Sequence, residues 1–461
     1  MLSSISFSLY YGENDLFPLL ISGIGISLIG AVLYLFTRKC NQDIKKREGY
    51  IVVSLGWLSM SLFGALPFVI HGAIPSYTDA FFETISGFTT TGASILNNIE
   101  ELPHGLLFWR SLTQWLGGMG MIVLSLAILP ILGIGGMQLF VAEVPGPTKD
   151  KIHPRVRETA KRLWGIYVLL TATETLLLII GGMSFFDAIN HAFTTMATGG
   201  FSTKQASVAY WQSPFIHYVI TMFMFFAGIN FSIHYYVMHK NFKVIRKNDE
   251  LKFYSYLIGF LTIVVSVALI LQNYAGIEKS FRDSLFQIVS IITTTGFVTA
   301  DYEIWGPFFK VLFFLLLFIG GCAGSTGGGV KIVRHLLLLK NSLLELRRLV
   351  HPRAIIPVRL NNSSVPQDIM SNILAFFLFY VLVFVAGTII MSIIGVDIIT
   401  AMGSVATSLG NVGPAIGSVG PSSNFAHIPD AGKWVLSILM LMGRLELFTI
   451  LIIFSPAFWK K

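Results

Sequence analysis

Apolar residues occur in long, nearly uninterrupted runs along this 461-residue chain, rather than in the short periodic stretches of a soluble protein. A helix needs about 20 consecutive apolar residues to cross a bilayer. Nine runs of roughly that length or longer are present, at residues 16–37, 50–71, 104–129, 163–183, 213–238, 253–272, 305–335, 369–395 and 430–457. We predict that each forms a membrane-spanning segment.

Four shorter apolar runs lie between the long ones, at residues 77–90, 185–197, 281–294 and 394–408. They are too short to span a bilayer and suit re-entrant half-helices. A glycine-centred turn follows each, and aligning the turns selects Gly92, Gly199, Gly296 and Gly413, which are 107, 97 and 117 residues apart. The repeated unit is therefore span, half-helix, glycine turn and span, four times in the same orientation.

This repeat predicts an all-α integral membrane protein with four units around a central pore and an extra N-terminal helix. The expected divisions are 1–48 for the extra helix and its cytoplasmic loop, then 49–145, 146–250, 251–360 and 361–461 for the four units. The third unit contains a glycine-rich loop within the membrane.

Composition and charge agree with a membrane location. Hydrophobic residues make up 54% of the chain and charged residues 12%, about half the usual charged share, which excludes soluble and disordered classes. Of the 32 lysines and arginines, 25 lie on alternate loops, and the positive-inside rule places those loops in the cytoplasm. Topology thereby accounts for the net charge of +8 without a nucleic-acid partner.

The four turns have the chemistry of an ion-selective pore. Irregular backbone at membrane depth is tolerated where it lines a water-filled path. Four such loops around one axis present rings of backbone carbonyls, which replace the hydration shell of a monovalent cation. The loops carry no acidic ring, which disfavours a divalent ion. The C-terminal ends of the half-helices add a negative dipole that favours a cation.

Several longer motifs resemble the TrkH branch of the bacterial TrkH/TrkG/KtrB potassium-transporter superfamily, nearly end to end. They are Lys46–Tyr50, Gly64–Pro67, Gln114–Gly120, Ala127–Leu139, Gly320–Gly329 and Gly443–Glu446. The resemblance implies potassium uptake across the bacterial cytoplasmic (inner) membrane through a single-chain pore. It also implies a homodimer surrounded by membrane lipid, with a TrkA-type cytoplasmic gating subunit that binds nucleotides.

The same resemblance implies that a potassium ion, and no covalent cofactor, occupies a filter of backbone carbonyls. The filter residues would be Thr90, Thr91 and Gly92; Ala197, Thr198 and Gly199; Thr294, Thr295 and Gly296; and Asn411, Val412 and Gly413. None of the loops reads TVGYG, so we expect weaker discrimination against sodium than in a symmetric channel. Family members usually begin with two extra helices, whereas here residues 16–36 form one and residues 1–11 resemble the stub of another.

The seventh long run is interrupted by six glycines in ten residues, namely Gly320, Gly321, Gly324, Gly327, Gly328 and Gly329. Each glycine disfavours helix by about 1 kcal/mol relative to alanine, so this segment should be a loop in mid-membrane below the filter. A phosphate-binding loop is disfavoured, because the Gly-Lys-Ser/Thr ending and a preceding strand are missing. A flexible kink and a movable gate remain, and the resemblance favours the gate.

Arg444 lies in the middle of residues 434–454, which are otherwise apolar except for Glu446. A charge at that depth is functional by default. One interpretation places Arg444 in the pore as a positive barrier opposite the glycine loop. The other is a buried ion pair that locks helices, with Glu83 or Glu446 as partner, although residues i and i+2 do not face each other on one helix.

Two other functional classes are weaker. A secondary transporter of a small solute, coupled to potassium or protons, would be expected to show inverted repeats, whereas these repeats are parallel. No nucleophile–base pair or metal cluster indicates an enzyme, and His191, His217 and His234 suit core or surface positions. The basic segments 144–162 and 331–360 would contact lipid headgroups or dock a cytoplasmic partner.

Overall fold

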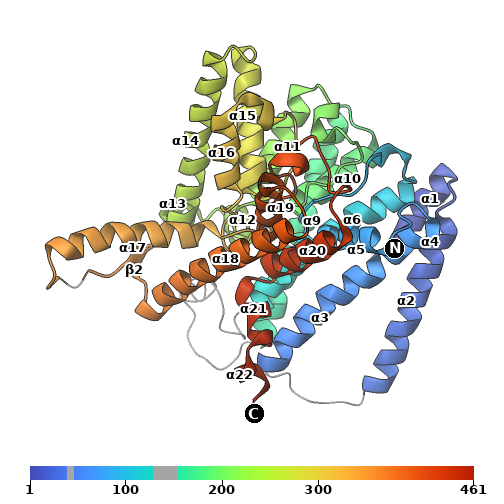
Figure 1. The fold of residues 1–461 in the computed structure, drawn as a ribbon, viewed down its shortest axis with the longest axis horizontal. Helices are drawn as coiled ribbons and strands as arrows, with labels where there is room; N and C mark the ends of the chain where they lie inside the picture. The colour runs from blue at the N-terminus through green and yellow to red at the C-terminus, as the bar shows by residue number, and fades with distance from the viewer. Residues whose placement is uncertain (39–45, 128–152, 355, 461) are drawn as a thin grey trace.

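The computed structural model describes residues 1–38, 46–127, 153–354 and 356–460 (Figure 1). Helices form most of this part of the chain. The strands β1 (Arg359–Leu360) and β2 (Ser363–Ser364) pair in an antiparallel hairpin of two residues each. The predicted all-α class is therefore confirmed.

Four units follow one another along the chain, each with a half-helix between two further helices. Unit 1 contains α3 (Lys46–Gly64), α4 (Leu66–His71), α5 (Tyr77–Phe88) and α6 (His104–Ala127). Unit 2 contains α9 (His153–Ile180), α10 (Phe185–Met196), α11 (Pro214–Ala227) and α12 (Phe231–Met238). Unit 3 contains α14 (Asp249–Leu271), α15 (Ile277–Ile292), α16 (Pro307–Leu316) and α17 (Ile332–Val350). Unit 4 contains α18 (Gln367–Ile393), α19 (Ile398–Gly410), α20 (Asp430–Arg444) and α21 (Leu447–Leu451).

The remaining α-helices of the described residues lie outside the repeat or connect its units. They are α1 (Ile5–Tyr11), α2 (Leu16–Thr37), α13 (Phe242–Lys247) and α22 (Pro456–Trp459). Helix α1 packs against α2 and α6, so the N-terminal helices lie beside unit 1. The predicted boundary between units 1 and 2, at residues 145 and 146, lies outside the described residues.

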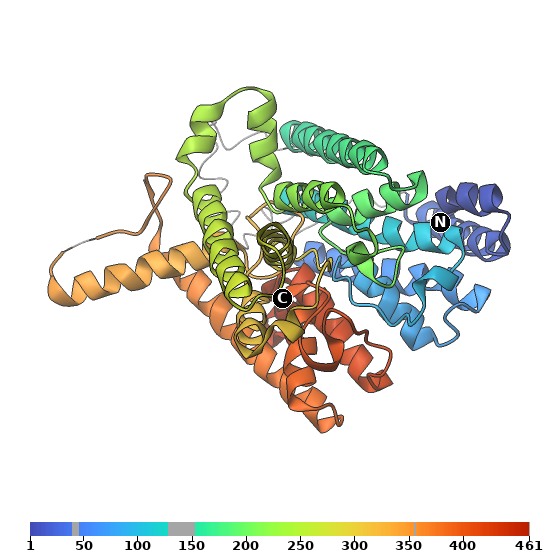
Figure 2. The same ribbon diagram turned by 90° about the horizontal axis from the view of Figure 1, so that it is seen from above.

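The half-helices α5, α10, α15 and α19 hold the units together. Each packs against the first and second long helices of its own unit. In addition α10 packs on α6, α15 on α11, and α5 on α20, so the last contact joins unit 4 back to unit 1. Seen from above, the colour passes from blue through green and yellow to red around the centre (Figure 2). The four half-helices therefore surround one axis.

Three of the four half-helices begin at a polar cap. The side chains of Ser76, Ser184 and Asp397 accept hydrogen bonds from the backbone N–H three residues later. Such a cap satisfies one of the free N–H groups of the first turn. The third half-helix follows Gly276 without a side-chain cap and begins four residues before the predicted position.

Five helices in the described part of the chain are long and apolar enough to span a membrane, or seven if each bent pair counts as one span. The bend between α11 and α12 is 103°, and the bend between α20 and α21 is 115°. The prediction of unbroken spans at residues 213–238 and 430–457 is therefore wrong. Hydropathy did not reveal these breaks, because apolar residues continue on both sides of each.

Candidate functional site

The C-terminal ends of the four half-helices share one backbone conformation. In each, a residue with left-handed φ donates its N–H to the carbonyl three residues earlier, and the next residue donates to the carbonyl five earlier. This pattern is a Schellman motif, in which the left-handed residue is usually glycine. Here the left-handed residues are Thr90, Thr198, Thr294 and Asn411, with φ of 53°, 53°, 59° and 52°. Four such residues at equivalent positions establish the register of the repeat.

A glycine with positive φ follows two residues later in every unit. These are Gly92, Gly200, Gly296 and Gly413, with φ of 81°, 74°, 82° and 104°. We define loop 1 as Thr90–Gly92, loop 2 as Thr198–Gly200, loop 3 as Thr294–Gly296 and loop 4 as Asn411–Gly413.

The predicted alignment was wrong by one residue in loop 2. It placed Ala197, Thr198 and Gly199 there, but Ala197 is the right-handed C-cap of α10 and corresponds to Thr89. The sequence has two adjacent glycines at this point, and only the backbone conformation shows that Gly200, not Gly199, is equivalent to Gly92. Loops 1, 3 and 4 have the predicted register.

Each loop glycine lies directly against a carbonyl oxygen of the next loop. A Cβ on Gly92 would collide with the oxygen of Gly199, one on Gly200 with that of Thr295, and one on Gly296 with that of Val412. A Cβ on Gly413 would lie 2.8 Å from the oxygen of Thr91. Those four oxygens belong to equivalent residues, so carbonyls and glycines alternate around a closed ring.

Side chains from outside the loops fix this ring. Nε2 of Gln114 on α6 donates to the Gly199 carbonyl at 2.7 Å, and its Oε1 accepts from the Phe201 N–H at 3.1 Å. Nδ2 of Asn411 donates to Oγ1 of Thr91 at 3.0 Å and joins loop 4 to loop 1. The sequence placed Gln114 in a family-like motif without giving it a role.

A cavity opens on one side of the ring. Its lining includes the glycine of every loop together with Arg110 and Lys204. The cavity therefore gives access to all four loops at once.

The predicted glycine loop lies against the opposite side of the ring, between α16 and α17. The N–H of Gly328 donates to Oγ1 of Thr294 at 2.7 Å, and Oγ1 of Thr326 donates to the Met196 carbonyl at 3.0 Å. A Cβ on Gly328 would lie 2.6 Å from the Gly410 carbonyl. The loop thus touches the C-terminal ends of α10, α15 and α19. It contains all six predicted glycines: Gly320, Gly321, Gly324, Gly327, Gly328 and Gly329.

Known proteins share this architecture. The profile of the TrkH family, described as cation transport protein, matches residues 17–461. The chain belongs to the TrkH family. The Trk system potassium uptake protein TrkH of Salmonella typhimurium is 45% identical over 440 residues, which cover 94% of this chain and 90% of that protein. The Trk system potassium uptake protein TrkG of Escherichia coli is 35% identical over 465 residues, covering 100% and 95%.

The fold of this TrkH-family chain also matches a solved structure, that of the potassium transporter TrkH from Vibrio parahaemolyticus. The TM-score is 0.91 at 39% sequence identity, with 100% of this chain and 96% of the other covered. The resemblance seen in the motifs is confirmed. Together with the long apolar helices, it makes this a multi-pass protein of the bacterial inner membrane.

Arg444 in this family member is the last residue of α20 and stands at the 115° bend. Its side chain is buried, and its two terminal nitrogens donate to the carbonyls of Thr326 and Gly117, each at 2.8 Å. Gly117 in turn packs against the Phe88 carbonyl, at the end of the first half-helix. Arg444 therefore connects the glycine loop to unit 1 beneath the ring.

The alternative interpretation of Arg444, an ion pair with Glu83 or Glu446, is wrong. Glu446 pairs with Arg334 at 2.5 Å, and Glu83 pairs with Arg110 at 2.6 Å. Within the ranges that the structure describes, no carboxylate lies within ion-pair distance of Arg444. Its charge faces the dipoles of these two carbonyls and the ring of Trp57, whose centre lies 5.7 Å from the guanidinium carbon.

Two basic residues lie elsewhere than the sequence predicted. Lys331 and Arg334 are both buried, although they were assigned to a cytoplasmic basic segment. Nζ of Lys331 donates to the Gly327 carbonyl, so this cation also holds the glycine loop. The rule that singled out Arg444, a charge inside an apolar run, would have found Lys331 as well.

His191 and His217 are buried and hydrogen-bonded, as expected of core residues, and His234 is half-buried. Part of the basic segment 144–162 lies outside the described residues.

Proposed function

We propose that this protein takes up potassium across the bacterial inner membrane through the ring of loops 1 to 4. The observation that carries the proposal is the closed alternation of equivalent carbonyls and glycines from four parallel units. Such carbonyls replace the hydration shell of potassium, and the half-helix C-termini add negative potential. The names of the relatives, potassium uptake proteins, support the same cargo.

In this proposal the ion is held by backbone oxygens of the four loops. They belong to Thr90, Thr91 and Gly92; Thr198, Gly199 and Gly200; Thr294, Thr295 and Gly296; and Asn411, Val412 and Gly413. The four loops differ in sequence, and only the Gly199 carbonyl among the four ring oxygens accepts from a glutamine side chain in the described structure. Unequal loops support a weaker preference over sodium than in a symmetric channel.

The glycine loop is the proposed gate. It lies against three half-helix ends and is held by hydrogen bonds from Arg444 and Lys331. Opening a path on this side of the ring requires those bonds to break. The force would come from a TrkA-type cytoplasmic subunit that binds nucleotides, acting on a homodimer of this chain. The exposed part of α17, which projects from the body in Figure 1, is a surface such a subunit could reach.

Rubidium flux into proteoliposomes tests the function. An imposed potential changes the energy of a monovalent cation by about 2.3 kcal/mol per 100 mV, so flux through a pore should rise with inside-negative voltage. Potassium should compete with rubidium, and sodium should compete less. Rubidium flux that is independent of the potential and depends only on an imposed proton gradient would instead indicate a secondary transporter.

A further inference from the structure

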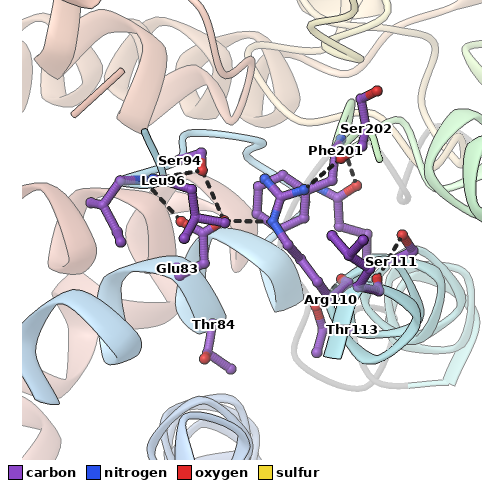
Figure 3. A network of polar contacts seen from close by, with 12 residues as sticks. Glu83, Thr84, Ser94, Leu96, Arg110, Ser111, Thr113, Phe201 and Ser202 are labelled. Atoms are coloured by element: carbon purple, nitrogen blue, oxygen red, sulfur yellow. Dashed lines mark hydrogen bonds and ion pairs between the residues drawn. The ribbon is translucent and has the colours of Figure 1, made fainter. Parts of the chain in front are cut away.

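A chain of polar contacts joins α5 and α6 to the segments that follow loops 1 and 2 (Figure 3). At its centre Nε of Arg110, on α6, lies 2.6 Å from Oε1 of Glu83, on α5. The side chains are 3% and 1% exposed. Removing one member of such a pair leaves an uncompensated buried charge, so the two residues act as one unit.

Glu83 holds the segment that leaves loop 1. Its Oε1 accepts a hydrogen bond from Oγ of Ser94 at 3.0 Å, and its Oε2 accepts from the N–H of Ile95 at 2.9 Å. Ser94 and Ile95 lie two and three residues after Gly92 in the chain. The carboxylate therefore fixes the outer end of this loop to its own half-helix.

Arg110 holds the corresponding segment of loop 2. Its Nη1 donates to the Ser202 carbonyl at 2.9 Å, and its guanidinium lies 3.5 Å from the centre of the Phe201 ring. Phe201 and Ser202 follow Gly200. Because Nε binds Glu83 and Nη1 binds Ser202, a single planar side chain joins two adjacent loops at a fixed separation.

In the described structure, the residues equivalent to Glu83 in the other units are not paired with an arginine that reaches the next loop. The register of the left-handed residues makes His191, Gln287 and Ser404 the equivalents of Glu83. His191 binds Oγ of Ser202 at 2.9 Å, Gln287 donates to Thr299 at 3.4 Å, and Ser404 donates to Ala401 of its own helix. Each of these contacts stays within one unit, whereas Arg110 crosses from unit 1 to unit 2.

We propose that Arg110 is a positioning residue that sets ion selectivity by holding loops 1 and 2 at one separation. The inference rests on the proposed function, since it assumes that the ring is the selective element. Each carbonyl of the ring packs on the glycine of a neighbouring loop. A change in the spacing of loops 1 and 2 therefore changes the opening that the ion meets.

The test measures the sodium-to-potassium permeability ratio of the purified protein in planar bilayers. The variants are Arg110→Lys, Arg110→Gln and the double variant Glu83→Gln/Arg110→Gln. Lysine keeps the charge but cannot bind Glu83 and Ser202 together. The matched control is Asp79→Asn, which breaks the Asp79–Lys433 pair one turn earlier on α5 and leaves Glu83 and Arg110 in place. A permeability ratio does not depend on how much of the protein is folded.

We expect all three variants to admit sodium at least tenfold more readily relative to potassium, and Asp79→Asn to keep the wild-type ratio. Folded Arg110→Lys and double variants with ratios within twofold of wild type would overturn the inference. If Arg110→Gln does not fold, the double variant keeps the test decisive. The double variant contains no unpaired carboxylate, because Glu83 is replaced as well. A wild-type protein without preference for potassium would overturn the proposed function instead, before any variant is compared.

Discussion

Gly413 in loop 4 lies against the carbonyl oxygen of Thr91 in loop 1, so that a Cβ on the glycine would be 2.8 Å from that oxygen. This contact joins the last unit to the first and closes the ring. Asn411 strengthens the same junction through its hydrogen bond to the Thr91 side chain. The proposed selective site is therefore complete only when the last unit of the repeat contacts the first.

Serine in place of a ring glycine should abolish selective uptake. At Gly92 and Gly296 the new Cβ would collide with a backbone carbonyl of the next loop, and the positive φ adds strain. We expect loss of growth rescue at low potassium, or a changed potassium-to-sodium permeability ratio, for Gly92→Ser and Gly296→Ser. Gly395→Ser is the control, because Gly395 has the same φ as Gly413, 104°, with no atom within 4 Å of its Cβ position. Unchanged growth and permeability in both ring variants would contradict the assignment.

The two adjacent glycines of loop 2 should respond differently. Gly200→Ala places a methyl group against the Thr295 carbonyl, whereas the atoms nearest to a Cβ on Gly199 belong to the end of the Gln114 side chain. We expect Gly200→Ala to lose rubidium flux and Gly199→Ala to keep part of it. Adding Gln114→Ala should leave Gly200→Ala inactive, because the collision with the Thr295 carbonyl remains. A greater loss of flux in Gly199→Ala than in Gly200→Ala would instead support the alignment of Gly199 with Gly92.

Run length, hydropathy and the positions of glycine were sufficient to predict the half-helices, the glycine turns and the glycine loop. They could not predict the register of loop 2, because two neighbouring glycines satisfy the same pattern. They could not pair Arg110 with Glu83, because the partners lie 27 residues apart on different helices. The bend after Ala227 was missed for a related reason, since a break between apolar helices leaves hydropathy unchanged.

Shortening the glycine loop should raise the resting flux. Deleting residues 324–328 removes the contacts of Thr326 with Met196 and of Gly328 with Thr294, which hold the loop against the ring. We expect a folded protein with faster rubidium uptake in the absence of any cytoplasmic partner. Deleting the hairpin residues 361–362 serves as a control for chain shortening outside the ring. A folded deletion protein with unchanged uptake would argue against a gate.

Arg444→Ala should raise the maximal flux with a modest loss of stability. The guanidinium lies beneath the ring, where at about 4 Å and an effective dielectric near 20 a unit charge opposes a cation by roughly 4 kcal/mol. Water in an open path lowers this figure, but a remaining barrier of about 1.4 kcal/mol still changes the rate about tenfold. Arg444→Ala also frees the Thr326 carbonyl, so the glycine loop is held less firmly. Arg444→Lys should give an intermediate flux, because the charge survives without the double hydrogen bond.

Arg334→Ala is the matched control for this last prediction, since Arg334 is also buried but pairs with Glu446. Its loss leaves a buried carboxylate without its partner and should lower stability by about 3–5 kcal/mol. Arg444→Ala leaves no carboxylate without a partner. Its stability should therefore fall by less, about 1–3 kcal/mol for the carbonyls that Arg444 bound. Rubidium uptake and thermal unfolding of both purified variants separate the possibilities. A destabilisation as large as that of Arg334→Ala, without any gain in flux, would mean that Arg444 only fastens helices together. Higher flux with the smaller loss of stability would mean that its charge and its hold on the glycine loop restrain the ion.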